Sequence, residues 1–321
     1  MIKVPDNAVI TLKNAFKTVT TGNVFIDFGK ATILYDSATS GDAAIFLDNA
    51  ANASNGKTVN SIALATVNND ATVTQLTLAN TLSGQRFDWY AFYTDNANPA
   101  KSGGYLGGIF QGFSDEASLV ITATRKLIRH AQYSSNMQIR KLDATRRVHL
   151  KGGRLTANGN TESHAITTRS KGIVIQGFVD AFVQDITFDQ PWAQCVQFVA
   201  CAAPRWDNIT VLNVGNMAAY NGYIYGVQVY GMNDCADGRN IVVRNGRHAG
   251  FTTNGNSASS NTWSQRGIPT NFVIDGVHGY NCNASVVDTH EEGDGGHITN
   301  VTNYFPYQDE DIAPNFSGIT I

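Results

Sequence analysis

The densest group of ionisable side chains in the sequence spans Asp288–Asp294, which reads Asp-Thr-His-Glu-Glu-Gly-Asp. The whole chain has five glutamates, and two of them, Glu291 and Glu292, lie in this segment together with two aspartates and His290. Cleavage of a glycosidic bond uses paired carboxyl groups: one acid protonates the leaving oxygen, and a second carboxylate activates water or attacks the sugar. We therefore take Glu291 as the candidate general acid, with Asp288 or Glu292 as its partner.

A structural role for the same segment stays open. Asp, Thr and His side chains at a turn often bond to neighbouring backbone groups, and Glu-Glu-Gly-Asp is also typical of a solvated loop. Both interpretations fit Glu291 and Glu292, and the structural one fits Asp294 better. The choice depends on where the fold places the cluster.

The elements that position these residues are expected to be β-strands. Glutamate is scarce, whereas Asn, Thr, Val, Ile and Gly abound, a composition typical of strands joined by many turns. From Val148 onward, short segments alternate apolar and polar residues, and Gly or Asn follows closely. Apolar positions in these segments recur at steps of 21 to 32 residues: Ile186, Ile209, Ile241, Phe272, Ile298 and Ile319. This period indicates the coils of a β-solenoid with loops of variable length.

Stacking of such coils would bring distant residues together. Asn side chains at equivalent turns are expected to form hydrogen-bonded ladders. Aligning Ala249 with Ala284 places Thr253 beside Asp288, so the acidic cluster would border the segment that begins at Arg247. Around this point we expect a groove that binds substrate, with cationic or imidazole side chains and loop aromatics that stack on sugar faces. The candidate substrate-binding residues are His290, Arg247, His248, Trp263 and Tyr225.

The fold class that follows is all-β, with one elongated domain over residues 1–321. Residues 151–321 should form regular coils, and residues 1–150 irregular N-terminal coils with a polar, Gly-rich loop inserted near 94–108. A β-sandwich also has short strands separated by turns and is the alternative. Variable loop lengths and the scarcity of tight Asn-Gly or Asp-Gly hairpin turns favour the solenoid.

Composition and motifs exclude several classes. A net charge of −3 without a Lys/Arg-rich block argues against nucleic acid as the partner. No stretch approaches the twenty apolar residues of a membrane helix, and the first ten residues lack the order of a signal peptide. GxSxG, phosphate-loop and HExxH motifs are absent, and no cofactor is required. The four cysteines lack CxxC spacing, so we expect free thiols packed as small hydrophobes: Cys195, Cys201, Cys235 and Cys282.

Three passages resemble the right-handed parallel β-helix proteins of the pectate-lyase-like superfamily, in particular bacteriophage tailspikes and capsule depolymerases. The first runs from Asp88 to Gly153, where a Trp-Tyr strand and a Gly-Gly-Ile turn lead into Val-His-Leu-Lys-Gly-Gly. The second is Asn-Gly-Arg-His-Ala-Gly-Phe-Thr-Thr at 245–253, and the third is Val287–Asp294. The likeness covers residues 20–321, and the last two passages carry most of its specificity.

The resemblance implies a homotrimer in a phage virion whose elongated sides bind, and usually cut, bacterial capsular or other surface polysaccharide. We expect a glycoside hydrolase acting outside the bacterial cell. A lyase that acts by β-elimination on a uronic acid and a non-catalytic adhesin are the alternatives, and the few basic residues near the cluster make elimination the weaker of the two enzymatic options. Attachment to the phage tail or baseplate would use a segment that this sequence lacks.

Overall fold

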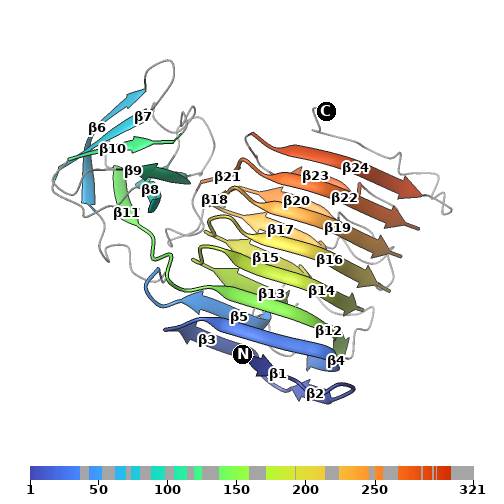
Figure 1. Ribbon diagram of the computed structural model, residues 1–321. Helices are drawn as coiled ribbons and strands as arrows, with labels where there is room; N and C mark the ends of the chain where they lie inside the picture. Colours follow the sequence, from blue (N-terminus) through green and yellow to red (C-terminus); the bar gives the residue numbers. More distant parts are fainter. Residues whose placement is uncertain are drawn as a thin grey trace.

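The computed structural model describes residues 1–36, 43–52, 62–69, 74–79, 88–97, 105–113, 119–124, 137–158, 171–191, 193–213, 224–245, 250–255, 267–282, 285–290, 293 and 295–304. Every regular element in these ranges is a β-strand. Most strands belong to a parallel β-helix whose coils stack from the N-terminal to the C-terminal end of the chain (Figure 1). Within the same ranges, no helix has the length and apolar character needed to cross a membrane.

Sheet A is the longer wall of the β-helix. Its strands pair in the order β1-β4-β12-β14-β16-β19-β22-β24, and β2 also pairs with β4. All of these pairings are parallel. The strands are β1 (Ile2–Lys3), β2 (Val9–Leu12), β4 (Val24–Asp36), β12 (Val148–Asn158), β14 (Ala181–Asp189), β16 (Arg205–Leu212), β19 (Asp237–Arg244), β22 (Val273–Tyr280) and β24 (His297–Tyr304).

Sheet B is the second wall, also wholly parallel, with the order β23-β20-β17-β15-β13-β5-β3. Its strands are β3 (Phe16–Thr20), β5 (Ala43–Asn49), β13 (Lys171–Gln176), β15 (Val196–Val199), β17 (Val227–Tyr230), β20 (Phe251–Asn254) and β23 (Val287–His290). A short third side contains the parallel pair β18 (Asn233–Asp234) and β21 (Pro269–Thr270). Parallel stacking of successive coils confirms the solenoid and rules out the antiparallel sandwich.

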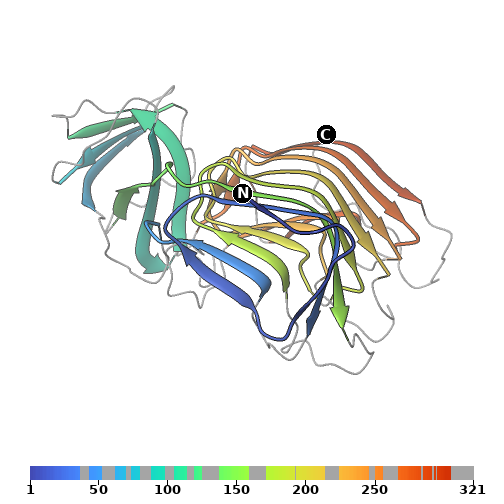
Figure 2. The same cartoon turned by 60° about the horizontal axis from the view of Figure 1, so that its bottom comes forward.

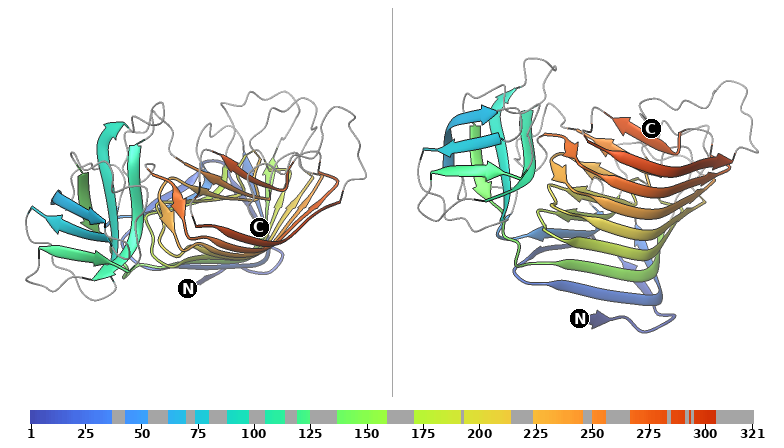
Figure 3. Two further views of the ribbon diagram at one scale, coloured as in Figure 1. Left: turned by 90° about the horizontal axis from the view of Figure 1, so that it is seen from above. Right: turned by 45° about the horizontal axis from the view of Figure 1, so that its top comes forward.

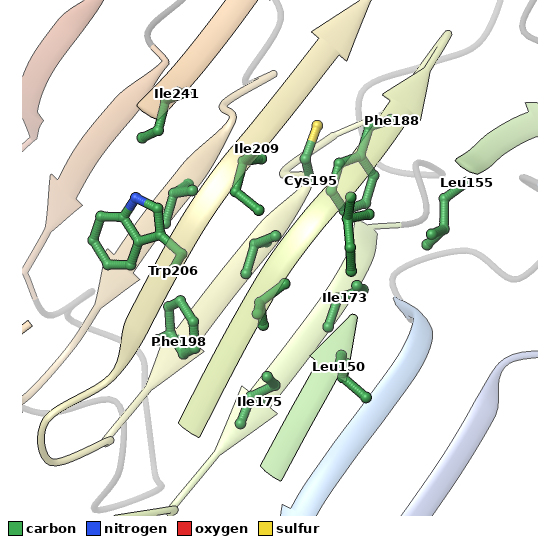
Figure 4. Packing of buried hydrophobic residues seen from close by; sticks show 14 of the residues in the cluster. Leu150, Leu155, Ile173, Ile175, Phe188, Cys195, Phe198, Trp206, Ile209 and Ile241 are labelled. Carbon is green, nitrogen blue, oxygen red and sulfur yellow. The ribbon is translucent and has the colours of Figure 1, made fainter. Parts of the chain in front are cut away.

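Apolar side chains from both sheets fill the interior of the coils (Figure 4). Ile186, Ile209 and Ile241 are partners on successive strands of sheet A, as the sequence predicts. The predicted register is wrong at the next coil, because the partner of Ile241 is Val277 and not Phe272. Ile298 accordingly pairs with Ile274. The step from Ile241 to Val277 is longer than the predicted step to Phe272, because the connection between the two strands takes up more residues. The spacing of apolar residues alone does not show where such a connection ends and the next strand begins. Ile319 lies outside the described residues.

Residues with left-handed backbone bend each coil at matching places. One such column crosses sheet A, where φ lies between 52° and 83°: Gly29, Gly152, Asp185, Asn208, Asn240, Gly276 and Asn300. Asn, Asp and Gly enter this region more readily than other residues, which explains their abundance. Their side chains bond from coil to coil: Asn208 Nδ2 donates to Asp185 Oδ1 at 3.0 Å, and Asn281 Nδ2 donates to Asn245 Oδ1 at 2.8 Å. The predicted Asn ladders are therefore confirmed.

A stack of aromatic rings runs through the middle of the core. Trp206 lies between Phe198 and Phe251, with ring centroids 5.8 Å and 5.7 Å away. It is 1% exposed, and its partner on the next strand of sheet A is Gly238. A Cβ at Gly238 would lie 2.0 Å from the indole, so this coil needs a residue without a side chain to admit the ring.

The described strands between residues 62 and 141 leave the β-helix and form a closed antiparallel barrel, which lies beside the coils in Figures 1 and 2. Its strands are β6 (Ile62–Asn69), β7 (Thr74–Leu78), β8 (Asp88–Ala97), β9 (Tyr105–Phe113), β10 (Val120–Ala123) and β11 (Met137–Lys141). The expectation of irregular coils is wrong for this stretch, and the insertion is larger than the predicted loop near 94–108. Alternating apolar and polar residues are common to coil strands and barrel strands, so the pattern does not distinguish them.

The barrel has a core of its own and packs on the third side of the β-helix, an arrangement that both views of Figure 3 show. The contact is a cluster of buried apolar residues: Ala91, Tyr93, Ile109, Leu142, Val179, Ala200, Ala202 and Met232. Asn52 secures the return of the chain to the coils. Its Nδ2 donates to Gly177 O at 2.8 Å, and its Oδ1 accepts from Asp143 N at 3.0 Å.

Candidate functional site

Asp288 lies on β23, at the C-terminal end of the strand order in sheet B. Val287 points into the core and is 2% exposed. Because side chains alternate along a strand, Asp288 points to the outer face, where it is half-buried. Its partner on β20 is Thr252, and His290 lies beside Asn254. The one acid of the predicted cluster that the structure describes therefore faces away from the core.

The predicted alignment of these coils is wrong by one residue. Thr253, which we expected beside Asp288, pairs with Thr289 and is buried. A slip of one residue exchanges the two faces of a strand, so the register decides which side chains a ligand can reach. Strand register depends on how whole coils pack on one another. The alignment of Ala249 with Ala284 used only a few residues and therefore did not fix it.

Polar side chains line the outer face of sheet B below Asp288. Gln197, Gln228, Thr252 and Asp288 occupy the same position on four successive strands, and we call them the polar column. Gln197 accepts a hydrogen bond from Lys171 Nζ at 2.8 Å and donates to Gln228 Oε1. The first three members are buried. Buried amides need hydrogen-bond partners, and here they find them in neighbouring coils.

Burial also changes the ionisation of Lys171, at the N-terminal end of this chain of hydrogen bonds. Loss of water around the ammonium group lowers the pKa of Lys171 below its usual value. The polar column was not predicted, although the sequence contains a signal for it: Val-Gln-Phe at 196–198 and Val-Gln-Val at 227–229 place a glutamine between two core residues in consecutive coils. A polar residue repeated at one strand position indicates a specific partner or ligand.

A second carboxyl group, Asp48 of β5, lies on the same face near the other end of sheet B. It is 3% exposed, and Gln176 Nε2 donates to its Oδ1 at 3.2 Å. Burial raises the pKa of Asp48 to about 6, although the Gln176 hydrogen bond and the charge of Lys17 act in the opposite direction. Asp48 is a titratable group that was not among the predicted site residues.

Asp48 and Asp288 are the two carboxylic acids within the described strands of sheet B. Five strand steps separate β5 from β23, and at ~4.8 Å per step this is roughly 24 Å. Pairs that cleave a glycosidic bond are separated by roughly 5 to 9.5 Å. Asp48 and Asp288 are therefore not such a pair, and a partner for Asp288 must come from elsewhere.

The remaining predicted site residues have different outcomes. Tyr225 is 1% exposed, so its predicted role in stacking on a sugar is wrong. The side chain of His290 lies outside the part of the molecule that the structure describes, although its backbone ends β23. Five other candidates fall wholly outside the described residues: Glu291, Glu292, Arg247, His248 and Trp263.

The cysteines are free thiols, and Cys195, Cys201 and Cys282 are buried, as predicted. Cys235 is exposed, so the expectation of a packed thiol is wrong for this residue. It follows the buried Asp234 at a left-handed turn with φ of 53°, and a side chain at this corner points outward. Burial raises the pKa of Cys201 to about 12, so its reactive thiolate form is rare.

A solved structure has a similar fold. Over 91% of this chain, the fold superposes on the tailspike protein gp49 from Pseudomonas phage LKA1 with a TM-score of 0.58 and 15% sequence identity. The chain shares the tailspike β-helix fold. It spans 45% of the length of that protein. No family model and no curated protein sequence matches the chain.

Two further tailspikes have weaker likeness to this β-helix. One is gp54 of Acinetobacter baumannii bacteriophage AP22, solved in complex with A. baumannii capsular saccharide, at 10% identity and a TM-score of 0.35 over 93% of this chain and 68% of that one. The other is gp61 of Pseudomonas phage phi297, at 12% identity and a TM-score of 0.32 over 90% of this chain and 66% of that one.

Proposed function

We propose that this chain binds a bacterial capsular or other surface polysaccharide and hydrolyses its glycosidic bonds, as the cutting part of a phage tailspike. The observation that carries the proposal is the outward position of Asp288 at the end of the polar column, with Glu291 and Glu292 following within four residues. The fold shared with the LKA1 tailspike and the resemblance of three sequence passages to tailspikes support it.

In the proposed reaction Glu291 donates a proton to the leaving glycosidic oxygen. Asp288 or Glu292 acts as the second carboxylate, which activates water or attacks the sugar. The strand positions beside Asp288 are well packed: Thr252 is fully buried on the neighbouring strand, and Gln228 on the strand beyond accepts a hydrogen bond from Gln197. A carboxylate supported in this way keeps a defined orientation toward a bound glycan.

The assembled protein is proposed to be a homotrimer that acts outside the bacterial cell as part of the virion. A trimer would allow a neighbouring copy to supply a carboxylate next to Asp288. As part of the virion it is proposed to be attached to the phage tail or baseplate.

A non-catalytic adhesin is the second candidate function. The observation in its favour is the roughly 24 Å between Asp48 and Asp288, since the described strands of sheet B then hold no pair of acids at catalytic distance. In this case Asp288, the half-buried member of the polar column, would contribute to glycan binding without cleavage.

Product analysis tests the proposal. The protein is incubated with a panel of purified bacterial capsular polysaccharides, and chain length, new reducing ends and unsaturated-uronate absorbance are measured. Shortening with new reducing ends and without that absorbance is expected for hydrolysis, and E291Q should abolish it while the fold stays intact. Absorbance from unsaturated uronate would replace hydrolysis with elimination, and binding without shortening would favour the adhesin.

A further inference from the structure

Three side chains form a stack on the outer face of sheet A, away from the polar column. Arg244, Tyr280 and Tyr304 end the successive strands β19, β22 and β24 and are partners in register. The guanidinium carbon of Arg244 lies 4.3 Å from the centroid of the Tyr280 ring, and the two tyrosine rings stack at 5.1 Å with 11° between their planes. We call these three residues the tyrosine stack.

The tyrosine stack is accessible to a ligand. Tyr304 is 56% exposed and Arg244 is also exposed, whereas Tyr280, between them, is half-buried. The sequence alone does not connect these residues, because 36 and 24 positions separate them along the chain. Equal strand positions on consecutive coils bring them together.

Arg244 differs from the other arginines on this sheet in how its charge is used. Arg154 pairs with Asp189 at 2.6 Å, and Arg205, whose guanidinium lies 5.0 Å from the Phe182 ring, pairs with Asp180. Among the described residues, Arg244 has no carboxylate partner and no hydrogen bond, and its contact is the Tyr280 ring. The ring holds the guanidinium in place while its donors stay available.

A second row of polar side chains borders the stack. His278 and Thr302 lie two residues before Tyr280 and Tyr304, so they share the same outer face. His278 Nδ1 and Thr302 Oγ1 are 2.7 Å apart. Together the two rows offer hydroxyl, imidazole and guanidinium groups next to an exposed aromatic ring, and they repeat at the strand spacing of ~4.8 Å along the helix axis.

We propose that the tyrosine stack is a second glycan-binding site, specific for an acidic polysaccharide that lies along the β-helix axis. A sugar ring packs against the exposed ring of Tyr304, and a carboxylate of the same glycan binds the donors of Arg244. No carboxylate among the described residues neutralises the positive charge of Arg244, so this charge favours an anionic ligand. A single arginine without a surrounding basic cluster does not suit nucleic acid. Strand spacing places the two contacts roughly 10 Å apart, so the ligand spans more than one sugar.

This inference rests on the proposed function insofar as glycan is taken to be the natural ligand, but it concerns a different sheet. A polysaccharide bound at both sheets would be held more tightly than one bound at either sheet alone, because the second contact becomes intramolecular. The tyrosine stack would then retain long polysaccharide chains while the Asp288 region acts on them.

Affinity electrophoresis in gels containing polygalacturonate, alginate or hyaluronan tests the site, with neutral dextran as the comparison. The unmodified protein should be retarded by at least one of the three uronate polymers and not by dextran. Tyr304→Ala and Arg244→Gln should each weaken this binding about tenfold, and Tyr304→Phe, which keeps the ring, should retain it. Arg205→Gln is the matched control, since that arginine also lies over a ring but already has a carboxylate partner, and it should change nothing.

Absence of retardation in all three uronate gels would overturn the inference, as would equal retardation of the unmodified protein, Arg244→Gln and Tyr304→Ala. Arg244 is exposed, so its replacement tests binding without disturbing the core. The dependence of retardation on Tyr304 should also hold in an Asp288→Asn background, because the two residues lie on different sheets. If the protein binds uronate polymers through Tyr304 but cleaves no capsular polysaccharide, the proposed hydrolysis is refuted and the proposed binding site at the tyrosine stack is supported.

Discussion

Asp48 and Asp288 lie on the same outer face of sheet B, but five strand steps, or roughly 24 Å, separate them. Their surroundings differ as well. Asp48 is buried beside Gln176, whereas Asp288 is half-buried at the last strand of the sheet, next to Thr252. Asp48 and Asp288 can therefore be replaced separately, and each replacement tests the role of one carboxylate.

Asp288→Asn is expected to lower the rate of capsule cleavage by about 100-fold or more, because it removes a carboxylate from the proposed acid–base pair. Asp48→Asn is the matched control: it makes the same chemical change on the same face, and it should leave the rate unchanged. The measurement is the release of reducing ends from a cleaved capsular polysaccharide. Full activity of Asp288→Asn would remove Asp288 from the proposed site.

The raised pKa of Asp48 predicts a pH-dependent contribution to stability. The folded protein holds this proton up to about pH 6, whereas the usual pKa is 3.8. Stability from Asp48 is therefore fully present below pH 3.8 and is lost as the pH rises through about 6. At pH 8, Asp48→Asn should have a higher melting temperature than the unmodified protein, and its free energy of unfolding should be higher by up to about 3 kcal/mol. The difference should vanish near pH 4. Thermal denaturation across a pH series measures this, and a pH-independent difference would contradict it.

Gly238→Ala is expected to destabilise the β-helix strongly. The added methyl group would lie 2.0 Å from the Trp206 indole, which is buried and stacked between two other core rings. Overpacking of this kind costs roughly 3 kcal/mol. Gly22→Ala is the control, because nothing lies within 4 Å of the corresponding Cβ position. Equal denaturation midpoints for the two variants would show that the core adapts around Trp206.

Asn208 tests the left-handed column of sheet A. Its φ is 53°, and its side chain donates to Asp185. Asn208→Gly keeps the backbone conformation and loses the hydrogen bond, which should cost about 1 kcal/mol. Asn208→Ala loses the same hydrogen bond and keeps a Cβ in the left-handed region without the polar group that lets Asn enter it, so it should cost about 1–2 kcal/mol more than the glycine variant. Chemical denaturation should therefore rank the unmodified protein above the glycine variant and the glycine variant above the alanine variant, and a reversed order of the two variants would argue against backbone strain at this corner.

The local features of the coils follow from sequence alone. Alternation around Ile186, Ile209 and Ile241 specifies strands with one apolar face, and Asn at positions such as 208 and 240 specifies left-handed corners. Both are short-range properties of a few neighbouring residues, because side-chain alternation and backbone dihedral preference act within one strand or turn. A repeating coil is the structure in which all of them are satisfied together.

The positions of functional side chains were decided by tertiary structure. Alternation is the same in the coils and in the barrel of residues 62–141, so the change from parallel to antiparallel pairing leaves no local signal. Thr252 rather than Thr253 lies beside Asp288, since strand register depends on how whole coils pack around residues such as Trp206. The contact of Arg244 with Tyr280 likewise forms between residues distant in sequence, and it exists only once the intervening chain has completed a turn of the helix.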